Sequence, residues 1–529
     1  MPILTVLTGT KVFNLEFSAG QNILNILEKS EIHIRLGCNG IGACGLCTIK
    51  VCQGVLSKPT MNEVMLISEE DISLGVRLAC QVTSEEDVTI DVSENLPQTR
   101  WRKTGITYSS LENCAPQFHS LPHDNPLGMA VDIGTTHIRV MVCDLATGRE
   151  ILSVVGSNPQ NIYGADVISR LVRTSDSDRF LDNISRKAIF AIGEALTEIA
   201  SLTGINLQHI KKTTIVGNTA MLALLSRKNT ALLLNPIQWS SYIDCLPDDT
   251  GDWAIAWGIH PHAMIEIIPP LGGFIGSDLL AGIEAVSLTK GKECKLFIDF
   301  GTNTEIALWD GATVWVTSCA GGPAFEGSGI SCGMPFDLGA IYGITSSEGK
   351  LEYRIVGNVA PRGICGSGIV DLIASLIRLK VVDCMGNFTG AKPQFAINIK
   401  NTKVIITKKD IDIVQRAKAS VGAAIISLLA KAGHHSSELA GIYLTGHFGS
   451  VLNISNAQDI GIIPMVDPEI VSLFGNTAIL GARNCLLSKS SKETIKTIGQ
   501  DAKVVNLAKS SSFEELLFEN LFLTPMGVV

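Results

Sequence analysis

The sequence predicts a multidomain α/β protein, with a small cysteine-bearing domain, a linker and a larger, duplicated α/β region. Two observations predict this organisation. Three cysteines lie close together near the N-terminus with a fourth farther along, and a strand–turn–strand unit occurs twice, 167 residues apart. The chain has 529 residues, of which 46% are hydrophobic and 18% charged. Two to four domains with large buried cores are therefore expected.

The cysteines lie on a glycine-rich loop, LGCNGIGACGLC, which holds Cys38, Cys44 and Cys47; Cys80 follows after 32 intervening residues. Each iron of a [2Fe–2S] cluster takes two thiolates, and nearby backbone N–H groups donate to its sulfides. The glycines let the backbone wrap the cluster without side-chain clash. The C-x5-C-x2-C spacing resembles the adrenodoxin-like branch of the ferredoxins, so all four cysteines are expected to be cluster ligands. The alternatives are a zinc knuckle, which usually pairs two short cysteine motifs, or buried thiols.

The elements around this loop follow the order of a β-grasp ferredoxin domain, which we expect to span residues 1–95. The patterns predict strands over 2–7, 12–17, 48–54, 77–82 and 87–92, with helices over 20–30 and near 68–75. Residues 96–127 contain four prolines and no sustained period, which indicates a linker. An ordered connector lying on the next domain is the alternative.

The repeated unit is an apolar strand, a turn with the pattern Asp-x-Gly-Thr, and a second strand. In each copy the glycine lets the turn backbone approach a phosphate, and the threonine hydroxyls and N–H groups can donate to its oxygens. The aspartates, Asp132 and Asp299, can hold Mg²⁺ through water and orient an attacking water. Two structural hairpins are the alternative. The predicted phosphate-binding residues are Gly134, Thr135, Thr136, Gly301, Thr302, Asn303 and Thr304.

These two units resemble the phosphate loops of the actin, sugar-kinase and Hsp70-type ATPase superfamily. The resemblance implies a middle domain over 128–208 and an actin-like ATPase domain over 209–529. It also implies an adenosine loop, matched by GIYLTGHFGSVL (441–452), in which Gly446 and Gly449 would flank the adenosine. Relatives have Gly-Gly-Phe-Gly there, and this chain has His447 at the second position. Two Gly-Asn-Thr-Ala segments, 217–220 and 475–478, are expected to connect the halves at the cleft, which is compatible with helix capping.

Composition excludes several classes of protein. The net charge of −9 argues against a nucleic-acid partner, which requires clustered Lys and Arg. The start, MPILTVLTGTKVF, lacks the pattern of a signal peptide, and no run of 18 apolar residues predicts a membrane span. The other ten of the 14 cysteines are scattered, as expected for buried thiols in a reducing compartment. We therefore expect a cytoplasmic protein of a cell with little oxygen.

The combination is similar, over most of the chain, to the reductive activators of corrinoid proteins, which share a so-called DUF4445 region. The matching segments are the cysteine loop, NPQNIYGADVISR, DIGTT, DFGTNTEIAL, AGGPAFEG, RGICGSGIVD, and KKDI with the following AKAS helix. The resemblance implies an iron–sulfur electron-transfer protein that hydrolyses ATP. Its expected cofactors are a [2Fe–2S] cluster, ATP and Mg²⁺. Its expected partners are a low-potential electron donor and a corrinoid-containing methyltransferase protein, whose Co(II) it returns to Co(I).

Two other functions fit parts of the sequence. One is an ATP-dependent activator of a radical dehydratase, but such activators resemble small dimers without an N-terminal ferredoxin domain. The other is an electron carrier fused to a nucleotide-sensing scaffold that does no catalysis. Glu305 and Glu326 are additional candidates for polar roles in the cleft. The assembly is left open between a monomer and a homodimer.

Overall fold

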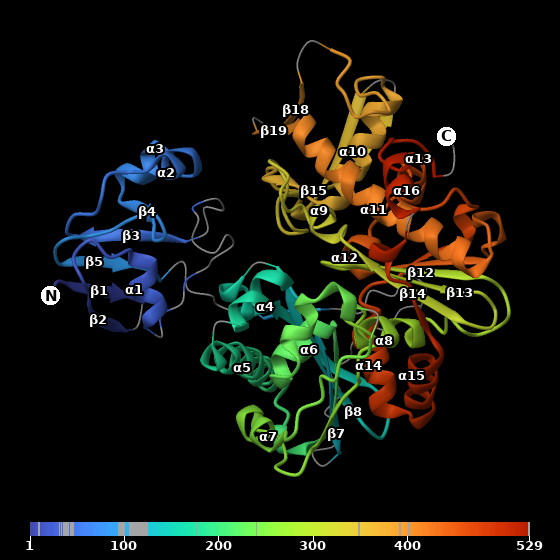
Figure 1. Cartoon of the computed structure of the whole chain (residues 1–529), viewed down its shortest axis with the longest axis horizontal. Helices are drawn as coiled ribbons and strands as arrows, with labels where there is room; N and C mark the ends of the chain where they lie inside the picture. The colour runs from blue at the N-terminus through green and yellow to red at the C-terminus, as the bar shows by residue number, and fades with distance from the viewer. Residues whose placement is uncertain are drawn as a thin grey trace.

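The computed structural model shows an N-terminal domain beside a larger body that consists of two α/β halves (Figure 1). It describes residues 1–526 except 9–10, 31, 33, 35–41, 43–46, 94–100, 105–124, 165, 176, 240, 348–349, 391–392, 400–401 and 511. The N-terminal domain lies next to α4 and α5 (Figure 1). The predicted α/β class, with a ferredoxin-type domain in front of a duplicated region, is confirmed.

The N-terminal domain is a five-stranded sheet in the order β2-β1-β5-β3-β4, in which β1 pairs in parallel with β5. Alternation along β1 buries Leu4 and Val6 against α1, whose first turn is capped by the side chain of Asn22. The predicted strand over 77–82 is only partly right, because β4 ends at Leu78 and the chain turns toward Cys80. The elements are β1 (Ile3–Leu7), β2 (Val12–Glu16), α1 (Ile23–Lys29), β3 (Thr48–Gln53), α2 (Met61–Leu66), α3 (Glu69–Ser73), β4 (Val76–Leu78) and β5 (Val88–Asp91).

A buried ion pair fixes α2, a helix that the sequence patterns did not predict, onto β4. The Glu63 carboxylate is fully buried and accepts two hydrogen bonds from the Arg77 guanidinium, at 2.9 and 3.0 Å. It also accepts from the backbone N–H groups of Thr60 and Leu78. Burial alone would raise the pKa of Glu63, but these hydrogen bonds lower it below its ordinary value. Glu63 therefore stays ionised and holds α2 beside the strand that leads to Cys80.

The two halves of the larger body repeat one topology. The first sheet has the order β11-β10-β7-β8-β9-β6 and the second β21-β20-β12-β13-β14-β22. In the first sheet β7, β8 and β9 are antiparallel neighbours, β10 pairs in parallel with β7, and β11 pairs in parallel with β10. In the second sheet β12, β13 and β14 take the antiparallel positions, and β20 and β21 take the parallel ones. The sheet strands are β6 (Arg102–Lys103), β7 (Leu127–Ile133), β8 (His137–Asp144), β9 (Glu150–Ser157), β10 (Ile210–Gly217), β11 (Met264–Ile267), β12 (Lys295–Phe300), β13 (Thr304–Trp309), β14 (Val314–Cys319), β20 (Gly441–Thr445), β21 (Val471–Leu473) and β22 (Lys503–Val504). The internal repeat read from the sequence is therefore a duplicated fold.

The predicted boundary between residues 208 and 209 falls inside the first sheet, because β10 pairs in parallel with β7 from Ile210 onward. We propose that the halves divide near residue 291, between α8 and β12. The helices of the first half are α4 (Val167–Ser175), α5 (Asp178–Thr203), α6 (Thr219–Ser226), α7 (Gly251–Trp257) and α8 (Ser277–Ala285). Most of the predicted linker lies outside the described residues, but β6 belongs to it and pairs with β9.

The second half carries two insertions and the C-terminal helices. The insertions are a three-stranded sheet, β16-β15-β17, and the hairpin of β18 and β19. The strands are β15 (Ala340–Ser347), β16 (Lys350–Ile355), β17 (Gly363–Ile364), β18 (Gln394–Ile399) and β19 (Thr402–Thr407). The helices are α9 (Gly322–Phe325), α10 (Gly366–Arg378), α11 (Lys408–Ala432), α12 (Gly446–Gly449), α13 (Ile454–Asp459), α14 (Thr477–Leu487), α15 (Lys489–Asp501) and α16 (Phe513–Glu519).

Helix α14 belongs to the second half in sequence but packs against α8 and β7 of the first half. The contact with α8 is close, because a Cβ added at Gly481 would lie 1.9 Å from the Ala281 carbonyl oxygen. One apolar cluster joins residues of both sheets, including Val216 from the first and Phe297 from the second, with Ala478 of α14. The halves therefore share a core.

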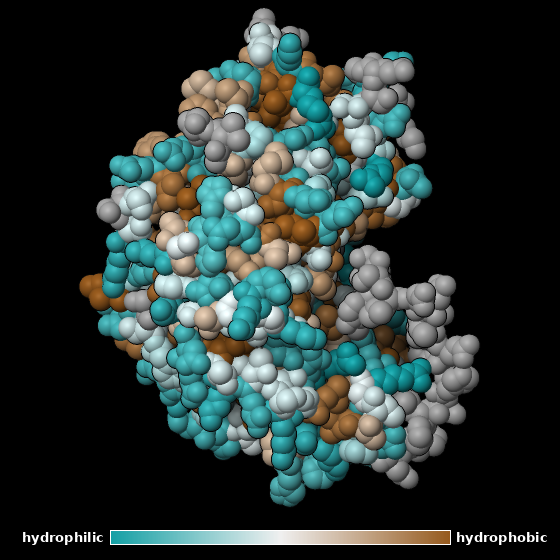
Figure 2. Space-filling view, turned by 90° about the vertical axis from the view of Figure 1, so that its right-hand side faces the viewer, coloured by the Kyte–Doolittle hydropathy of each residue, from teal (hydrophilic) through white to brown (hydrophobic). Residues whose placement is uncertain are grey.

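Helix α11 confirms the long helix predicted over 408–433, and a capping box of Thr407 and Asp410 begins it. Its length and composition alone would allow it to cross a membrane, yet 72% of its most apolar 18-residue window is buried inside the protein. It packs against β13 and β14, as expected of a core helix. On the face seen in Figure 2, hydrophobic residues are interspersed with hydrophilic ones.

Candidate nucleotide cleft and cluster site

The two predicted phosphate loops meet between the two sheets. The first follows β7 and the second follows β12, at equivalent positions of the duplicated fold. The hydroxyl oxygens of Thr136 and Thr302, one from each loop, are 2.9 Å apart and share a hydrogen bond. Two segments 166 residues apart in sequence are thus brought into contact.

Four acidic residues gather beside these loops. Asp132 is the second-last residue of β7, Asp299 lies opposite Glu305 in the β12–β13 pair, and Asp278 lies in the first turn of α8. Their charges act on one another: burial, and then the neighbouring carboxylates, raise the pKa of Asp278 and Glu305 well above the ordinary values. The pKa of Asp299 is raised to about 7, by burial first and by Asp132 second.

Arg139 and Asn476 counter part of this negative charge. A guanidinium nitrogen of Arg139 lies 3.8 Å from Asp132 Oδ2, and the Asn476 amide donates to the same oxygen at 2.7 Å. Burial raises the pKa of Asp132, and both partners act to lower it. One nearby guanidinium cannot balance four carboxylates, and a bound divalent cation would favour their ionised forms.

The donor set fits Mg²⁺ better than a metal held by protein ligands alone. Among the residues that the structure describes, no group of three or more His, Cys, Asp or Glu could hold a metal ion. Mg²⁺ is usually held by one or two carboxylates, with water and phosphate oxygens completing its shell. Asp132 and Asp299 would be those carboxylates.

Both Gly-Asn-Thr-Ala segments contact the first Asp-x-Gly-Thr unit. Asn218 caps α6, accepting from the Met221 N–H, and donates its amide to the Thr135 hydroxyl at 3.1 Å. Asn476 caps α14, accepting from the Ile479 N–H, while its amide donates to Asp132. Each asparagine therefore both begins a helix and positions a residue of the first phosphate loop.

The predicted adenosine loop begins with strand β20, as expected, but the Gly-rich turn after it is a short helix, α12. Gly446 has φ +85°, and a Cβ there would lie 2.9 Å from Asp299 Oδ1. Only glycine tolerates both this backbone conformation and this close approach. Phe448 is buried and stacks on Phe325, with ring centroids 4.7 Å apart. Gly449 ends α12, which the structure thus places beside the second phosphate loop.

The remaining predicted residues differ in their surroundings. Burial raises the pKa of Glu326 to about 7, and a hydrogen bond with the Thr302 side chain acts in the opposite direction. Thr304 is fully buried at the start of β13, and its hydroxyl has no hydrogen-bond partner among the described residues. Gly134, Gly301 and Asn303 lie in the two turns. The side chain of His447 lies outside the described residues.

Replacing Asp299 with asparagine should stabilise the protein, and more so at high pH. With a pKa near 3.8 when unfolded and about 7 when folded, the Asp299 carboxyl makes the folded chain bind more protons between these values. The stability that depends on this group is therefore fully present below pH 3.8 and is lost as the pH rises toward 7. We expect Asp299→Asn to raise the melting temperature by several degrees at pH 8 and by less at pH 5.

Thermal unfolding at both pH values checks this prediction. Asp252→Asn, at an exposed position in the first turn of α7, is the control and should change the melting temperature little at either pH. A melting temperature of Asp299→Asn that is unchanged or lower at pH 8 would contradict the assignment of a costly buried charge.

Two of the four predicted cluster ligands lie side by side. Cys47 precedes β3 and Cys80 follows β4, and their sulfurs are 3.2 Å apart and buried. The contact with the Cys47 thiol lowers the pKa of Cys80 to about 6, against burial, with help from Gln81 and the Gly42 N–H. A buried pair of sulfurs with an acidic thiol suits thiolate ligation of iron. Cys38 and Cys44 lie outside the described residues.

Sequence analysis missed several residues of these sites. Asp278 lies just after Gly276, where a Cβ would meet the Asn218 Cα at 2.4 Å. Only this packing brings it to the phosphate loops. Arg139 lies on β8 directly opposite Asp132, a position that a register of the predicted hairpin could have shown. The Asn158 amide donates to the Gly134 carbonyl at 2.9 Å, and its segment, NPQNIYGADVISR, was noted only for its resemblance.

Comparisons with known proteins agree along the whole chain. Residues 293–528 match the family model described as the C-terminal domain of RACo, the ASKHA domain. Residues 127–291 match the RACo middle region, and residues 9–85 match a 2Fe-2S iron-sulfur cluster binding domain. The middle region ends at residue 291 and the C-terminal domain begins at residue 293, which agrees with the division near residue 291 proposed from the sheets.

Two curated relatives and one solved structure are similar over most of their lengths. The "Corrinoid activation enzyme RamQ" of Eubacterium limosum is 32% identical over 416 residues, which are 74% of this chain and 70% of that protein. The "[Co(II) methylated amine-specific corrinoid protein] reductase" of Methanosarcina barkeri is 24% identical over 76% of each chain. The structure titled "Reductive activator for corrinoid,iron-sulfur protein" superposes with a TM-score of 0.65 over 99% of both chains, at 24% identity, and supports the fold.

Proposed function

The chain belongs to the family of reductive activators of corrinoid proteins, and from this premise we propose that it couples ATP hydrolysis to one-electron reduction of a partner's corrinoid. The electron acceptor is the Co(II) corrinoid of a methyltransferase protein, which gains one electron and becomes Co(I). A low-potential donor supplies that electron through the [2Fe–2S] site. ATP and water yield ADP and phosphate in the same cycle.

The contact between the two phosphate loops carries this proposal. Thr136 and Thr302 meet across the cleft, and Asp132 and Asp299 lie beside them at the ends of β7 and β12. A triphosphate between the loops would accept hydrogen bonds from hydroxyl and N–H groups of both halves. The binding energy of the nucleotide would therefore depend on how the two halves are arranged. Such a difference is required if nucleotide binding is to drive electron transfer.

Each side chain has a definite task in this scheme. Asp132 and Asp299 would hold Mg²⁺ and orient the attacking water, and the two loops would hold the phosphates. Asn218 and Asn476 hold Thr135 and Asp132 in place. Gly446 keeps the adenosine loop against Asp299. Cys47 and Cys80, with Cys38 and Cys44, would hold a [2Fe–2S] cluster, which supplies a one-electron carrier.

Energetics explain why nucleotide is needed. Plant-type clusters have reduction potentials of about −400 mV, and each ~59 mV of uphill transfer of one electron costs ~1.4 kcal/mol. A corrinoid whose Co(II)/Co(I) potential lies lower is reduced only if another process shifts the balance. A nucleotide provides that shift when it binds two states of the complex with different affinity.

The decisive experiment mixes the anaerobically reconstituted, reduced protein with candidate Co(II) corrinoid proteins, with and without MgATP. The absorption band of Co(I) reports reduction, and phosphate release reports hydrolysis. The proposal predicts fast Co(I) formation only with MgATP. Equal reduction without ATP would instead favour an electron carrier fused to a nucleotide-sensing scaffold.

A further inference from the structure

We propose that the face made by η1 (Pro159–Tyr163), α4 and the start of α5 is a docking surface for the chain's own cluster domain, and that nucleotide binding releases the domain from it. The inference rests on the proposed function, because it takes the first phosphate loop to bind nucleotide. It adds the route by which the loop and the cluster domain communicate.

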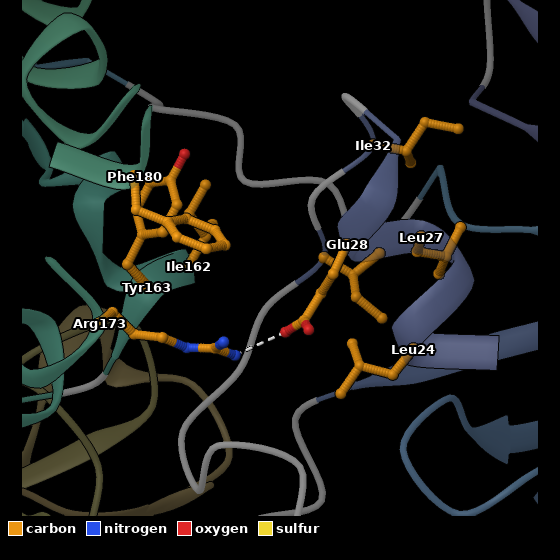
Figure 3. A pocket seen from close by; sticks show the side chains of 9 residues that line it. Leu24, Leu27, Glu28, Ile32, Ile162, Tyr163, Arg173 and Phe180 are labelled. Carbon is orange, nitrogen blue, oxygen red and sulfur yellow. Dashed lines mark hydrogen bonds and ion pairs between the residues drawn. The ribbon is translucent and has the colours of Figure 1, made fainter. Parts of the chain in front are cut away.

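The docked contact combines apolar side chains with one ion pair (Figure 3). An Arg173 guanidinium nitrogen, on α4, lies 2.6 Å from Glu28 Oε1 on α1, and both side chains keep about a quarter or less of their surface exposed. Around the pair, apolar side chains of the two domains line a cavity of about 20 Å³. These are Leu24, Leu27, Ile32 and Ile34 of the cluster domain and Ile162, Tyr163 and Phe180 of the first half.

This contact is suited to reversible docking. Arg173 also lies over the Phe180 ring, 5.9 Å from its centroid, so its guanidinium is already oriented toward Glu28. A partly exposed ion pair contributes little free energy. A handful of apolar side chains around a small cavity adds more, but far less than a domain core.

The helix that docks is tied to a cluster ligand. Asn22 caps α1 by accepting from the Leu24 N–H, and its amide donates to the Cys80 carbonyl at 2.9 Å. Glu28 lies near the other end of the same short helix. Because α1 connects the two points rigidly, docking at Glu28 fixes the orientation of Cys80 relative to the larger body.

The docking surface is tied in turn to the first phosphate loop. Asn158 is fully buried, and its amide donates to the Gly134 carbonyl at 2.9 Å while its backbone N–H donates to the Thr136 carbonyl at 2.8 Å. The same residue caps η1 by accepting from the Gln160 N–H. Any displacement of the loop is therefore passed to η1.

The loop contact sets the direction of the effect. Thr136 and Thr302 share a hydrogen bond at 2.9 Å, and a phosphate group that accepts from both hydroxyls replaces this bond. In the proposed mechanism the phosphate sits between the two loops and parts them. Parting them moves Thr136 and, through Asn158, the segment that carries Ile162 and Tyr163. Nucleotide and docking then oppose each other, and each weakens the other by the same factor.

A zero-length cross-link tests the docking. In the full-length, reconstituted protein with Arg173→Lys, a carbodiimide should join residues 28 and 173, as detected by mass spectrometry of the peptides. Addition of magnesium and the non-hydrolysable analogue adenosine 5′-(β,γ-imido)triphosphate should lower the yield at least about fivefold. The pair of Lys228 and Asp248, 2.6 Å apart and both within the first half, is the internal control and should cross-link equally in both conditions.

The outcomes separate the two proposals. Binding of the analogue is measured on the same protein by calorimetry. If the analogue binds and the yield of the cross-link between residues 28 and 173 is unchanged, nucleotide does not release the domain, while the proposed function stands. If it fails to bind, the proposed function fails and the release with it. A cross-link that never forms in nucleotide-free protein, while Lys228 and Asp248 react, overturns the docking surface itself.

Variants at Glu28, Arg173 and Asn158 test the coupling independently, through the affinity for the analogue and the response of the cross-link to nucleotide. Glu28→Arg and Arg173→Glu should each bind the analogue at least about fivefold more tightly than the parent protein, and the double variant should return to the parent affinity. Asn158→Ala, combined with Arg173→Lys, should cross-link as before but lose the response to nucleotide. Unchanged affinity in both reversals, or a full response with Asn158→Ala, would overturn the coupling.

Discussion

Asp132→Asn and Asp299→Asn are each expected to lower the rate of ATP-driven corrinoid reduction by at least about 100-fold. Asparagine keeps the size of the side chain but removes the charge that Mg²⁺ requires. Asp132 and Asp299 come from opposite halves and lie beside loops that contact each other, so neither can replace the other. The loss should appear in Co(I) formation and in phosphate release alike.

Asp144→Asn is the matched control for this pair. Asp144 ends β8, at the far end of the same hairpin, where it accepts from Asn125 and from turn N–H groups. The Asp144→Asn variant should keep the rate within about twofold, because Asp144 lies away from the phosphate loops and does not stabilise the charge that develops in the reaction. In all three variants the visible spectrum of the reduced protein should match that of the parent. A near-normal rate in either cleft variant would contradict its assigned role.

Cys47→Ser and Cys80→Ser should each abolish a stable two-iron centre. The two sulfurs lie 3.2 Å apart in a buried position, and a serine hydroxyl is a far weaker iron ligand than an acidic thiol. We expect iron content and visible absorbance after anaerobic reconstitution to fall at least about tenfold. Phosphate release in the absence of a corrinoid partner should be retained, since the cleft residues belong to the two halves of the larger body.

Cys52→Ser gives the comparison that makes the cysteine result specific. Cys52 lies on β3, five residues after Cys47, but its side chain is exposed. This variant should reconstitute like the parent. Equal iron content in Cys80→Ser and Cys52→Ser would contradict the ligand assignment.

Local patterns in the sequence predicted most of the fold because the signals are themselves local. The cysteine spacing, the two Asp-x-Gly-Thr turns and the Gly-Asn-Thr-Ala segments each specify a loop by its own residue types. Asp278 gave no such signal, because only the packing of Gly276 against Asn218 brings it to the cleft. The partnership of Arg173 with Glu28 depends on how two domains meet, which no single segment encodes.

The position of α14 has a consequence for the chain as a folding unit. This helix follows the second sheet in sequence yet covers α8 and β7 of the first, with Gly481 against the Ala281 backbone. A fragment that ends near residue 291 would expose to water the apolar surface of α8 and β7 that α14 covers. A fragment that begins near residue 291 would contain α14 but not the surface against which it packs. Expressed as separate fragments, the halves should aggregate unless both are synthesised together. A truncation after residue 488 would keep α14, which ends at Leu487 and holds the two halves together.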